Sequence, residues 1–228
     1  MRFLALATDY DGTLAHHGEV SDAAVAALHR LRASGRKAIL VTGREVPDLL
    51  TAFPHLELFD VVVAENGALL YFPEDRREEE LAEAPPGQFL RALRERGVSP
   101  LSIGRSIVAS TELESNKILD AIRSLGLELQ VIFNKGSLMV LPSGVNKASG
   151  LAVALEHLGV SPRNVVGVGD AENDHALLRF CGCRVAVANA LPALKERADI
   201  VTRGSHGEGV VELIDRLIAG DLDSTARH

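Results

Sequence analysis

Residues 3–13 read Phe-Leu-Ala-Leu-Ala-Thr-Asp-Tyr-Asp-Gly-Thr, an apolar run that ends in two aspartates and a glycine. The run from Phe3 to Thr8 predicts a buried strand that is closed by a turn. Asp9 and Asp11 therefore fall at the carboxyl end of a strand, which is the edge where open α/β sheets bind ligands. Two carboxylates this close repel each other unless a cation lies between them or one of them holds a proton. A turn capped by Asp9 explains the same residues, so this pair alone leaves both interpretations open.

Outward from this first strand, short apolar runs alternate with helical patterns over most of the chain. Such an alternation favours parallel strands with helices on both faces of the sheet. The predicted fold class is α/β, with a Rossmann-like, doubly wound parallel sheet as its core. The predicted core strands are residues 3–8, 37–42, 61–64, 165–168, 184–188 and 200–201, and the main predicted helices follow Ser21 and Pro47 and cover residues 147–158, 174–180 and 209–218.

The alternation is interrupted near residue 73. Residues 75–83 are heavily charged, and Pro85-Pro86-Gly87 is a break that the interior of a helix or strand would not tolerate. Asn134-Lys135-Gly136 predicts a hairpin turn and therefore antiparallel strands. We expect a core of residues 1–73 and 143–228, interrupted by a smaller α+β insert of residues 74–142 and ending in a frayed tail at 221–228. Within the insert, helices are predicted at 88–96 and 114–125, and strands at 106–110, 128–133 and 137–141.

The composition narrows the possible partners and the compartment. The 228 residues include 31 acidic and 24 basic side chains, and the formal charge of −7 argues against a general nucleic-acid binder. No apolar run approaches the ~20 residues of a membrane span, and Asp9 comes too early for a signal peptide. Cys181 and Cys183 fit a reducing compartment and are too few for a four-ligand zinc site. We therefore expect a cytoplasmic protein whose two cysteines are small packed residues.

Two further clusters have the residue types of an anion site. Val41-Thr42-Gly43-Arg44 ends a predicted strand, and a hydroxyl with free backbone N–H groups can hold phosphate oxygens. A plain strand-to-helix turn leading to Pro47 explains this cluster too. Lys147 stands at the start of a predicted helix, where the helix dipole favours anions. A bound anion therefore explains this lysine better than helix stability does, although a surface lysine remains an alternative.

The last cluster, residues 167–174, reads Gly-Val-Gly-Asp-Ala-Glu-Asn-Asp after a valine-rich strand. Its Gly-x-Gly is similar to a dinucleotide fingerprint, but Glu172 stands where the third glycine should allow close helix packing. A pyrophosphate would also face the carboxylates of Asp170 and Glu172. We therefore exclude a dinucleotide site and retain Asp170 and Asp174 as candidate functional carboxylates.

Taken in order, these clusters closely resemble the motifs of the haloacid dehalogenase superfamily of phosphatases, which are D-x-D-G-T, a strand-ending Thr or Ser, a Lys, and G-D-x-x-N-D. Glu65-Asn66-Gly67-Ala68, Gly144-Val145-Asn146-Lys147 and the Val-Ala-Val-Ala-Asn-Ala run at 185–190 resemble the Cof-type subgroup, which carries a type IIB cap. The core resemblance covers residues 1–73 and 143–220. The insert lies where this subgroup carries its cap, and its short length resembles the small archaeal-type phosphoglycolate phosphatases.

The resemblance implies an Mg²⁺-dependent phosphatase that works through an aspartyl-phosphate. Asp9 would be the nucleophile, and Asp11 would protonate the leaving group and then activate the water. Mg²⁺ would be held by the carboxylates of Asp9 and Asp170 and by the backbone carbonyl of Asp11. The phosphate would be bound by Thr42, Gly43, Lys147 and Asn173, and Asp174 would hold a metal-bound water or orient Lys147.

The resemblance places the choice of substrate in the cap, where the sequence marks only candidates. Arg105, Asn134 and Lys135 are possible polar contacts, and Arg44 could reach the phosphate or form a structural salt bridge to an acidic neighbour. We expect the partner to be a small phosphorylated metabolite, either phosphoglycolate or a small sugar phosphate, and neither nucleic acid nor a membrane; no pattern sets an oligomeric state. The remaining candidates, which we expect in loops, are His16, His17 and His206, with His206 at the border of the entrance as an alternative.

Two other functions use similar residues. A receiver-type signalling domain also gathers aspartates, a Thr or Ser and a Lys around Mg²⁺, as a phosphorylated switch without turnover. Asp11 as a leaving-group acid and the insert favour the enzyme, because a switch needs neither. A phosphomutase or phosphotransferase of the same superfamily is the second alternative, and no motif in the predicted cap marks one. Release of inorganic phosphate from a phosphomonoester would separate both from a phosphatase.

Overall fold

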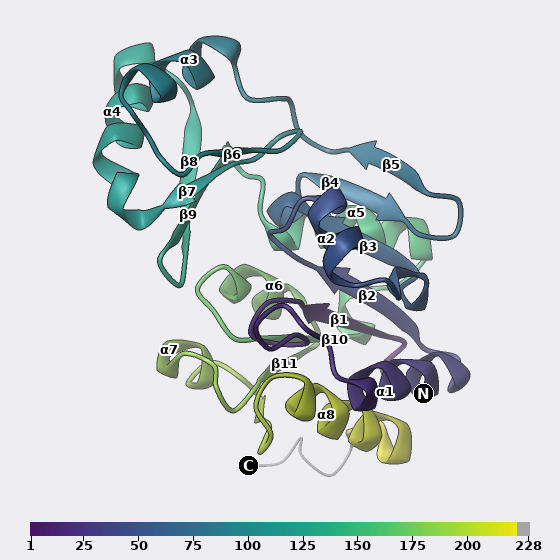
Figure 1. The fold of residues 1–228 in the computed structure, drawn as a ribbon. Helices are drawn as coiled ribbons and strands as arrows, with labels where there is room; N and C mark the ends of the chain where they lie inside the picture. Colours follow the sequence, from purple (N-terminus) through teal and green to yellow (C-terminus); the bar gives the residue numbers. More distant parts are fainter. Residues whose placement is uncertain (223–228) are drawn as a thin grey trace.

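The computed structural model describes residues 1–222, so residues 223–228 of the tail, where the sequence predicts fraying, lie outside the described residues. The strands form two sheets (Figure 1). The larger sheet has the order β12-β11-β10-β1-β2-β3-β4-β5, and the smaller has the order β6-β7-β9-β8. All strands of the smaller sheet lie between β5 and β10 in the sequence, so a second unit is inserted into the first, as predicted.

Six parallel strands form most of the larger sheet. β1 lies between β2 and β10, with Ala5 aligned with Lys37 on one side and with Val165 on the other. Because these strands are covered on both faces, they are mainly runs of Val, Leu, Ile and Ala rather than alternating patterns. The six are β1 (Ala5–Asp9), β2 (Lys37–Val41), β3 (Val61–Ala64), β10 (Val165–Gly169), β11 (Cys183–Ala186) and β12 (Ile200–Val201).

Helices pack on both faces of this sheet, which confirms the doubly wound arrangement. Leu6 of β1 belongs to the hydrophobic core on one face, whereas its neighbours Ala5 and Ala7 belong to the core on the other. Each fully buried leucine contributes roughly 1.5–3 kcal/mol by leaving water. On the first face lie α1 (Asp22–Ala33), α2 (Val46–Ala52), α7 (Pro192–Lys195) and α8 (His206–Gly220); on the second lie α5 (Lys147–Leu158) and α6 (Asp174–Phe180).

Two antiparallel strands extend the larger sheet, and the second lies beyond the predicted end of the core's first segment at residue 73. β4 (Leu69–Phe72) pairs with β3, and β5 (Arg77–Glu80) pairs with β4 as the outer strand. The sequence analysis placed the charged segment at 75–83 in the insert and predicted no strand there. Charged side chains protect an exposed sheet edge from further pairing, so the composition of β5 suits its place. The smaller sheet and its helices therefore begin only after β5.

The inserted unit, residues 87–142, is called the cap below. Its two helices pack against one face of the four-stranded sheet through side chains such as Phe89, Ile118 and Val140. The opposite face carries Met139 and Ile107, which pack with Ala68 of the core. The elements are α3 (Gly87–Glu95), β6 (Ser102–Ile103), β7 (Val108–Thr111), α4 (Ser115–Leu125), β8 (Leu129–Asn134) and β9 (Ser137–Pro142).

The predicted hairpin turn of the cap is confirmed. Asn134 of β8 pairs with Ser137 of β9, and the two residues between them, Lys135 and Gly136, have positive φ values of 45° and 82°. Positive φ at both central residues is the geometry of a type I′ turn. In Figure 1 the tip of this hairpin points from the cap toward the core, near α6.

Short 3₁₀ turns connect several elements and shift some predicted boundaries. The predicted helix at 114–125 is preceded by a 3₁₀ turn, and α4 itself begins at Ser115. The 3₁₀ turns are η1 (Leu56–Leu58), η2 (Glu65–Gly67), η3 (Glu112–Glu114) and η4 (Pro162–Asn164).

The first residue of the predicted tail, Asp221, is bonded to the core. Its carboxylate accepts hydrogen bonds from the backbone of Arg2 and Phe3 and from the Arg36 side chain.

Two expectations from composition concern the described part of the chain. Within residues 1–222, no helix is both long and apolar enough to cross a membrane. Cys181 and Cys183 are buried and unpaired with each other, and burial raises the pKa of Cys183 to about 11 and that of Cys181 further. Thiols that stay protonated in this way are poor nucleophiles and metal ligands, which supports the prediction that both are packed residues.

Candidate active site

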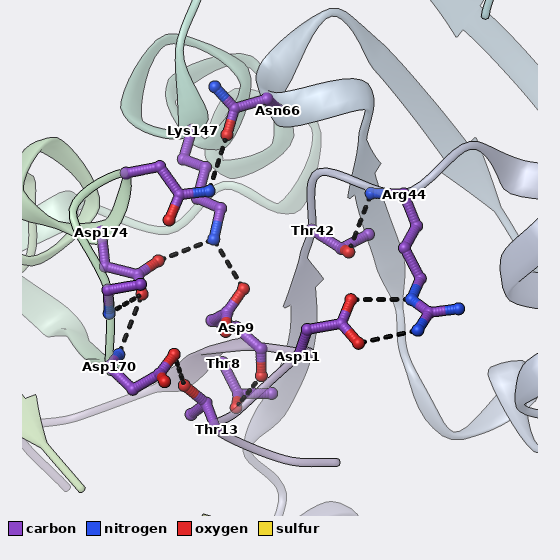
Figure 2. A network of polar contacts seen from close by, with 12 residues as sticks. Thr8, Asp9, Asp11, Thr13, Thr42, Arg44, Asn66, Lys147, Asp170 and Asp174 are labelled. Atoms are coloured by element: carbon purple, nitrogen blue, oxygen red, sulfur yellow. Dashed lines mark hydrogen bonds and ion pairs between the residues drawn. The ribbon is translucent and has the colours of Figure 1, made fainter. Parts of the chain in front are cut away.

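The predicted motifs meet at the carboxyl edge of the larger sheet. Asp9 is the last residue of β1, Thr42 follows β2 directly, and Asp170 follows β10. Parallel strands end at a common edge, so residues far apart in sequence come together there. Figure 2 shows Asp9 and Asp174 at the end of Lys147, Asp170 next to Thr13, and Asp11 turned toward Arg44.

Lys147 is an internal cation and not a surface lysine. Its side chain is 1% exposed, and Nζ donates to Oδ1 of Asp9 over 2.6 Å and to Oδ1 of Asp174 over 2.7 Å. Burial alone would lower the pKa of Lys147, but the two carboxylates outweigh burial and raise it above its usual value. A lysine with two buried anionic partners stays charged, which suits it to hold a negatively charged group beside Asp9.

The start of α5 places this lysine. Asn146 caps the helix, since its side chain accepts from the N–H of Ala148 at 2.9 Å and of Ser149 at 3.2 Å, and its own N–H donates to the Ser149 hydroxyl at 2.9 Å. Gly67 packs so closely on the Asn146 carbonyl that a Cβ at Gly67 would overlap it. The capping box and this contact fix Lys147 at the first helical position.

Three buried aspartates form a cluster with excess negative charge. One carboxylate oxygen from each of Asp9, Asp170 and Asp174 lies within 4.8 Å of the others. Burial, reinforced by the charge of Asp174, raises the pKa of Asp9 well above its usual value, and burial likewise raises the pKa of Asp170. Carboxylates that crowd together without enough cations provide hard oxygen ligands of the kind that Mg²⁺ prefers. The donor set thus fits the predicted metal.

Asp170 and Asp174 are oriented by several hydrogen bonds. Oδ2 of Asp174 accepts from the backbone N–H of Asp170 at 2.9 Å and of Ala171 at 3.0 Å, while its Oδ1 accepts from Lys147. The Thr13 hydroxyl donates to Oδ1 of Asp170 at 3.0 Å. Asp174 therefore connects the loop that carries Asp170 to Lys147, which agrees with the predicted orienting role and leaves that role a prediction.

Asp11 points away from this cluster toward Arg44 (Figure 2). Nε and Nη2 of Arg44 donate to the two oxygens of Asp11, each over 2.7 Å, and Nη1 donates to Asp48 at 2.8 Å. A two-pronged bond of this kind is among the strongest side-chain pairings. Of the two alternatives left open for Arg44, the structure shows the salt bridge to acidic neighbours.

The predicted phosphate-binding turn lies between the aspartates and the cap. Thr42 is buried, and its hydroxyl accepts from the N–H of Arg44 at 3.1 Å. A Cβ at Gly43 would lie 3.1 Å from Sδ of Met139, so this cap side chain packs directly over the turn. A side chain at position 43 would require the thioether of Met139 to move by a few tenths of an ångström.

Asn173 directly precedes Asp174 and pairs with a residue from another motif. Its Nδ2 donates to Oδ1 of Asn66 at 3.2 Å, and both side chains are buried. Within residues 1–222, Nδ2 of Asn66 and Oδ1 of Asn173 have no hydrogen-bond partner. The amide of Asn173 thus stands where a bound group could complete its hydrogen bonding.

The three candidate substrate contacts of the cap differ in position. Lys135, at the hairpin tip, brings Nζ onto Oδ2 of Asp170. Asn134 precedes it at the end of β8. Arg105 does not join the cluster, because its guanidinium pairs with Glu78 and Glu80 of β5. This geometry gives no support to Arg105 as a substrate contact, because its side chain is paired with the acidic strand β5. The sequence analysis did not predict that strand.

Glu65 is a buried residue to which the sequence analysis gave no role of its own. Its carboxylate accepts three backbone hydrogen bonds from the cap, from Arg105 at 2.9 Å, Ser106 at 2.8 Å and Ile107 at 3.0 Å. Glu65 and Asn66 have positive φ values of 47° and 56°, an uncommon backbone for side chains of this size. The local signal was a glutamate directly after a buried strand.

A second set of missed contacts surrounds the loop after Asp11. The carbonyl of Gly12 accepts from Nδ2 of Asn189 at 2.7 Å and lies 2.9 Å from Nδ1 of His206. The His206 ring stacks on His16, with centroids 4.3 Å apart, and His16 in turn contacts His17 at 4.1 Å. His206 therefore supports the loop from outside, and the three histidines lie together.

Comparison with known proteins agrees with this fold. The model of the haloacid dehalogenase-like hydrolase family matches residues 6–100 and 95–214. The chain belongs to this family. A relative named phosphoglycolate phosphatase, from Methanothermobacter thermautotrophicus, is 32% identical over 220 residues, covering 94% of this chain and 98% of the relative.

Solved structures extend the agreement to the arrangement of core and cap. A putative HAD/COF-like hydrolase from Plasmodium vivax superposes with a TM-score of 0.80 at 21% identity, covering 97% of each chain. A HAD subclass IIB sugar phosphatase superposes with a TM-score of 0.75 at 19% identity, covering 93% of this chain and 98% of that one. The predicted Rossmann-like core with an inserted cap is therefore confirmed.

Proposed function

We propose that this protein is an Mg²⁺-dependent phosphatase that hydrolyses a small phosphomonoester through an aspartyl-phosphate on Asp9. One observation supports this above all. Oδ1 of the buried Asp9 is held by Lys147 at 2.6 Å, while within residues 1–222 its Oδ2 takes no hydrogen bond. An oriented carboxylate with one free oxygen, beside a fixed cation, is what attack on a phosphoryl group requires.

In the first half-reaction, an oxygen of Asp9 forms a bond to phosphorus and the bond to the leaving alkoxide breaks. Asp11 in its protonated form gives its proton to that alkoxide. The resulting Asp11 carboxylate then takes a proton from water, whose oxygen attacks phosphorus, releases inorganic phosphate and restores Asp9. The salt bridge between Asp11 and Arg44 must open for these steps, because both oxygens of Asp11 are engaged in it.

The remaining residues of the site bind and orient the phosphoryl group. We expect the phosphoryl group to lie beside Asp9. Its oxygens would be contacted there by Lys147, the Thr42 hydroxyl, the Gly43 backbone and the Asn173 amide. Mg²⁺ would be held by the carboxylates of Asp9 and Asp170 and by the backbone carbonyl of Asp11. Asp174 would hold a metal-bound water or orient Lys147. The bound ion supplies charge stabilisation of the phosphoryl oxygens and offsets the repulsion between the carboxylates and an anionic substrate.

Phosphoglycolate is the first candidate substrate. The support is the printed name of a relative that matches nearly the whole chain, together with the contact between Met139 and Gly43, which narrows the space over the phosphate-binding turn. A small sugar phosphate is the second candidate, supported only by the name of a structural neighbour.

The test is release of inorganic phosphate by the purified protein with Mg²⁺ over a panel of phosphomonoesters. We expect turnover of phosphoglycolate with stoichiometric phosphate, and none when Asp9→Asn replaces the wild type. Transfer of the phosphoryl group to a second alcohol without phosphate release would identify a phosphotransferase instead. A single phosphorylation without turnover would identify a switch.

A further inference from the structure

We propose that Lys135 is the specificity-determining residue of the cap and that it binds a carboxylate on the leaving group of the substrate. This inference rests on the proposed function and deepens it. It names the substrate class as phosphomonoesters whose alcohol carries a carboxylate within one or two carbons of the ester oxygen.

The hairpin turn delivers this lysine to the catalytic edge. The type I′ turn puts Lys135 at the tip, where its backbone N–H donates to Oε2 of Glu172 at 3.2 Å. Its Nζ contacts Asp170, and a Cβ at Gly12 would lie 3.1 Å from Nζ. The ammonium group thus lies over the loop that follows the proposed nucleophile.

Lys135 is the one cation of the cap, residues 87–142, that contacts a carboxylate of the proposed metal site, that of Asp170. Arg105 is engaged by β5, and Lys117 pairs with Glu114 at the far side of the cap. On the hairpin strands, Met139 and Ile132 belong to an apolar cluster that also contains Ala68 of the core. A polar or charged part of the leaving group therefore has a single cationic partner on this surface.

The present partner of Lys135 is one that it would lose in the working enzyme. Asp170 is a proposed ligand of Mg²⁺, and a divalent cation there repels an ammonium group on the same carboxylate. The Lys135 side chain is 41% exposed and has a flexible four-carbon stem, so Nζ is free to move away. The phosphoryl group already has Lys147, which leaves a second anionic group on the substrate as the natural partner.

The experiment compares substrates that differ only in that second group. Phosphoglycolate and ethyl phosphate share a two-carbon leaving group, but only the first carries a carboxylate. We expect Lys135→Met to lower kcat/KM for phosphoglycolate by about 10- to 100-fold, the range for loss of a charged hydrogen bond, and to change that for ethyl phosphate less than ~3-fold. Lys135→Arg should retain most of the preference, and Lys117→Met, a matched loss of a cap lysine, should change neither.

A binding measurement makes the test independent of turnover. Titration calorimetry in Mg²⁺ would compare 3-phosphonopropionate with propylphosphonate, which are inert analogues with and without the carboxylate. Lys135→Met should weaken binding of the first and leave that of the second unchanged. Equal losses for both members of either pair would show that Lys135 serves the phosphoryl group, and a wild type without preference for the carboxylate would also overturn the inference.

The two proposals fail in different ways. Turnover of ethyl phosphate with no effect of the carboxylate would leave a phosphatase whose Lys135 has no such role. Absence of phosphate release from every substrate would refute the proposed function, while the calorimetric comparison would still decide whether Lys135 binds a carboxylate.

Discussion

The carboxyl edge of the core sheet and the cap surface opposite it differ in how their side chains are held. At the core edge, Lys147 is 1% exposed and bonded to two carboxylates that come from other motifs. On the cap, Lys135 is 41% exposed at a hairpin tip, and Met139 on the following strand is held by apolar packing. The core edge is fixed by bonds between distant segments, whereas the cap surface depends on single side chains. Changes at the core should therefore affect all substrates alike, and changes at the cap should discriminate among them.

The largest effect should come from the nucleophile. Asp9→Asn should lower turnover to background for every substrate, a loss of at least ~10³-fold, because an amide cannot form the acyl-phosphate. Phosphate release and a thermal melt would be measured together, since the melt shows whether the core is still folded. Substantial turnover by this variant, or a phosphoryl label that maps to a histidine such as His206, would contradict the aspartyl-phosphate.

Metal removal should act on the same edge. Exhaustive treatment with EDTA should abolish activity, and Mg²⁺ should restore it, because Asp9, Asp170 and Asp174 together repel a phosphate dianion. Ca²⁺ should bind but support little turnover, since its larger shell accepts bidentate carboxylates that would occupy the attacking oxygen of Asp9. Phosphate release by stripped enzyme with each ion gives the answer, and full activity after EDTA would exclude the metal.

Asp11→Asn should give a smaller and substrate-dependent loss. An alkyl phosphate needs a proton on its leaving oxygen and should lose about 10²- to 10⁴-fold. An aryl phosphate such as p-nitrophenyl phosphate should lose less in the first step, so phosphorylated enzyme should accumulate at Asp9. Rapid-quench labelling followed by peptide mass mapping would detect it. Equal losses for both substrates would argue against a role for Asp11 as the acid.

The smallest effect on turnover should come from the contact between Glu65 and the cap. Glu65→Ala removes the acceptor of three cap N–H groups, at a cost of about 1–3 kcal/mol for each buried group left unpaired. We expect faster hydrogen exchange at residues 105–107 and a loss of kcat/KM that is greater for phosphoglycolate than for p-nitrophenyl phosphate. Ser102→Ala, which removes a surface contact to Glu45, is the matched control. Unchanged protection at 105–107 would mean that other contacts hold the cap.

The sequence was most informative where a single segment contains the whole signal. The strands before Asp9, Thr42 and Asp170 are apolar runs with polar residues at their ends, and their meeting at one edge follows from parallel pairing. β5 was missed because Arg-Glu-Glu-Glu has neither apolar alternation nor β-branched residues. Because β5 was not predicted, the sequence analysis had no partner in view for the side chain of Arg105, which pairs with this strand.

Other parts of the site depend on partners that no local pattern contains. The role of Glu65 requires a loop some forty residues further on, whose contribution is backbone N–H groups that are the same in any sequence. The salt bridge between Asp11 and Arg44 was one of two alternatives, and only the rotation of both side chains decides between them. Asn189 reaches Gly12 across 177 positions of the chain.

The joint at Glu65 has a consequence for how such a molecule can change over generations. The Glu65 carboxylate accepts hydrogen bonds from the main-chain N–H groups of residues 105–107. These bonds do not depend on the side chains at 105–107, provided that no proline removes a donor. The cap can therefore accept new residues over most of its surface and still keep its contact with Glu65, while the catalytic edge of the core is unaltered. New substrate preferences are then within reach of single replacements at the hairpin, with no need to rebuild the machinery beneath it.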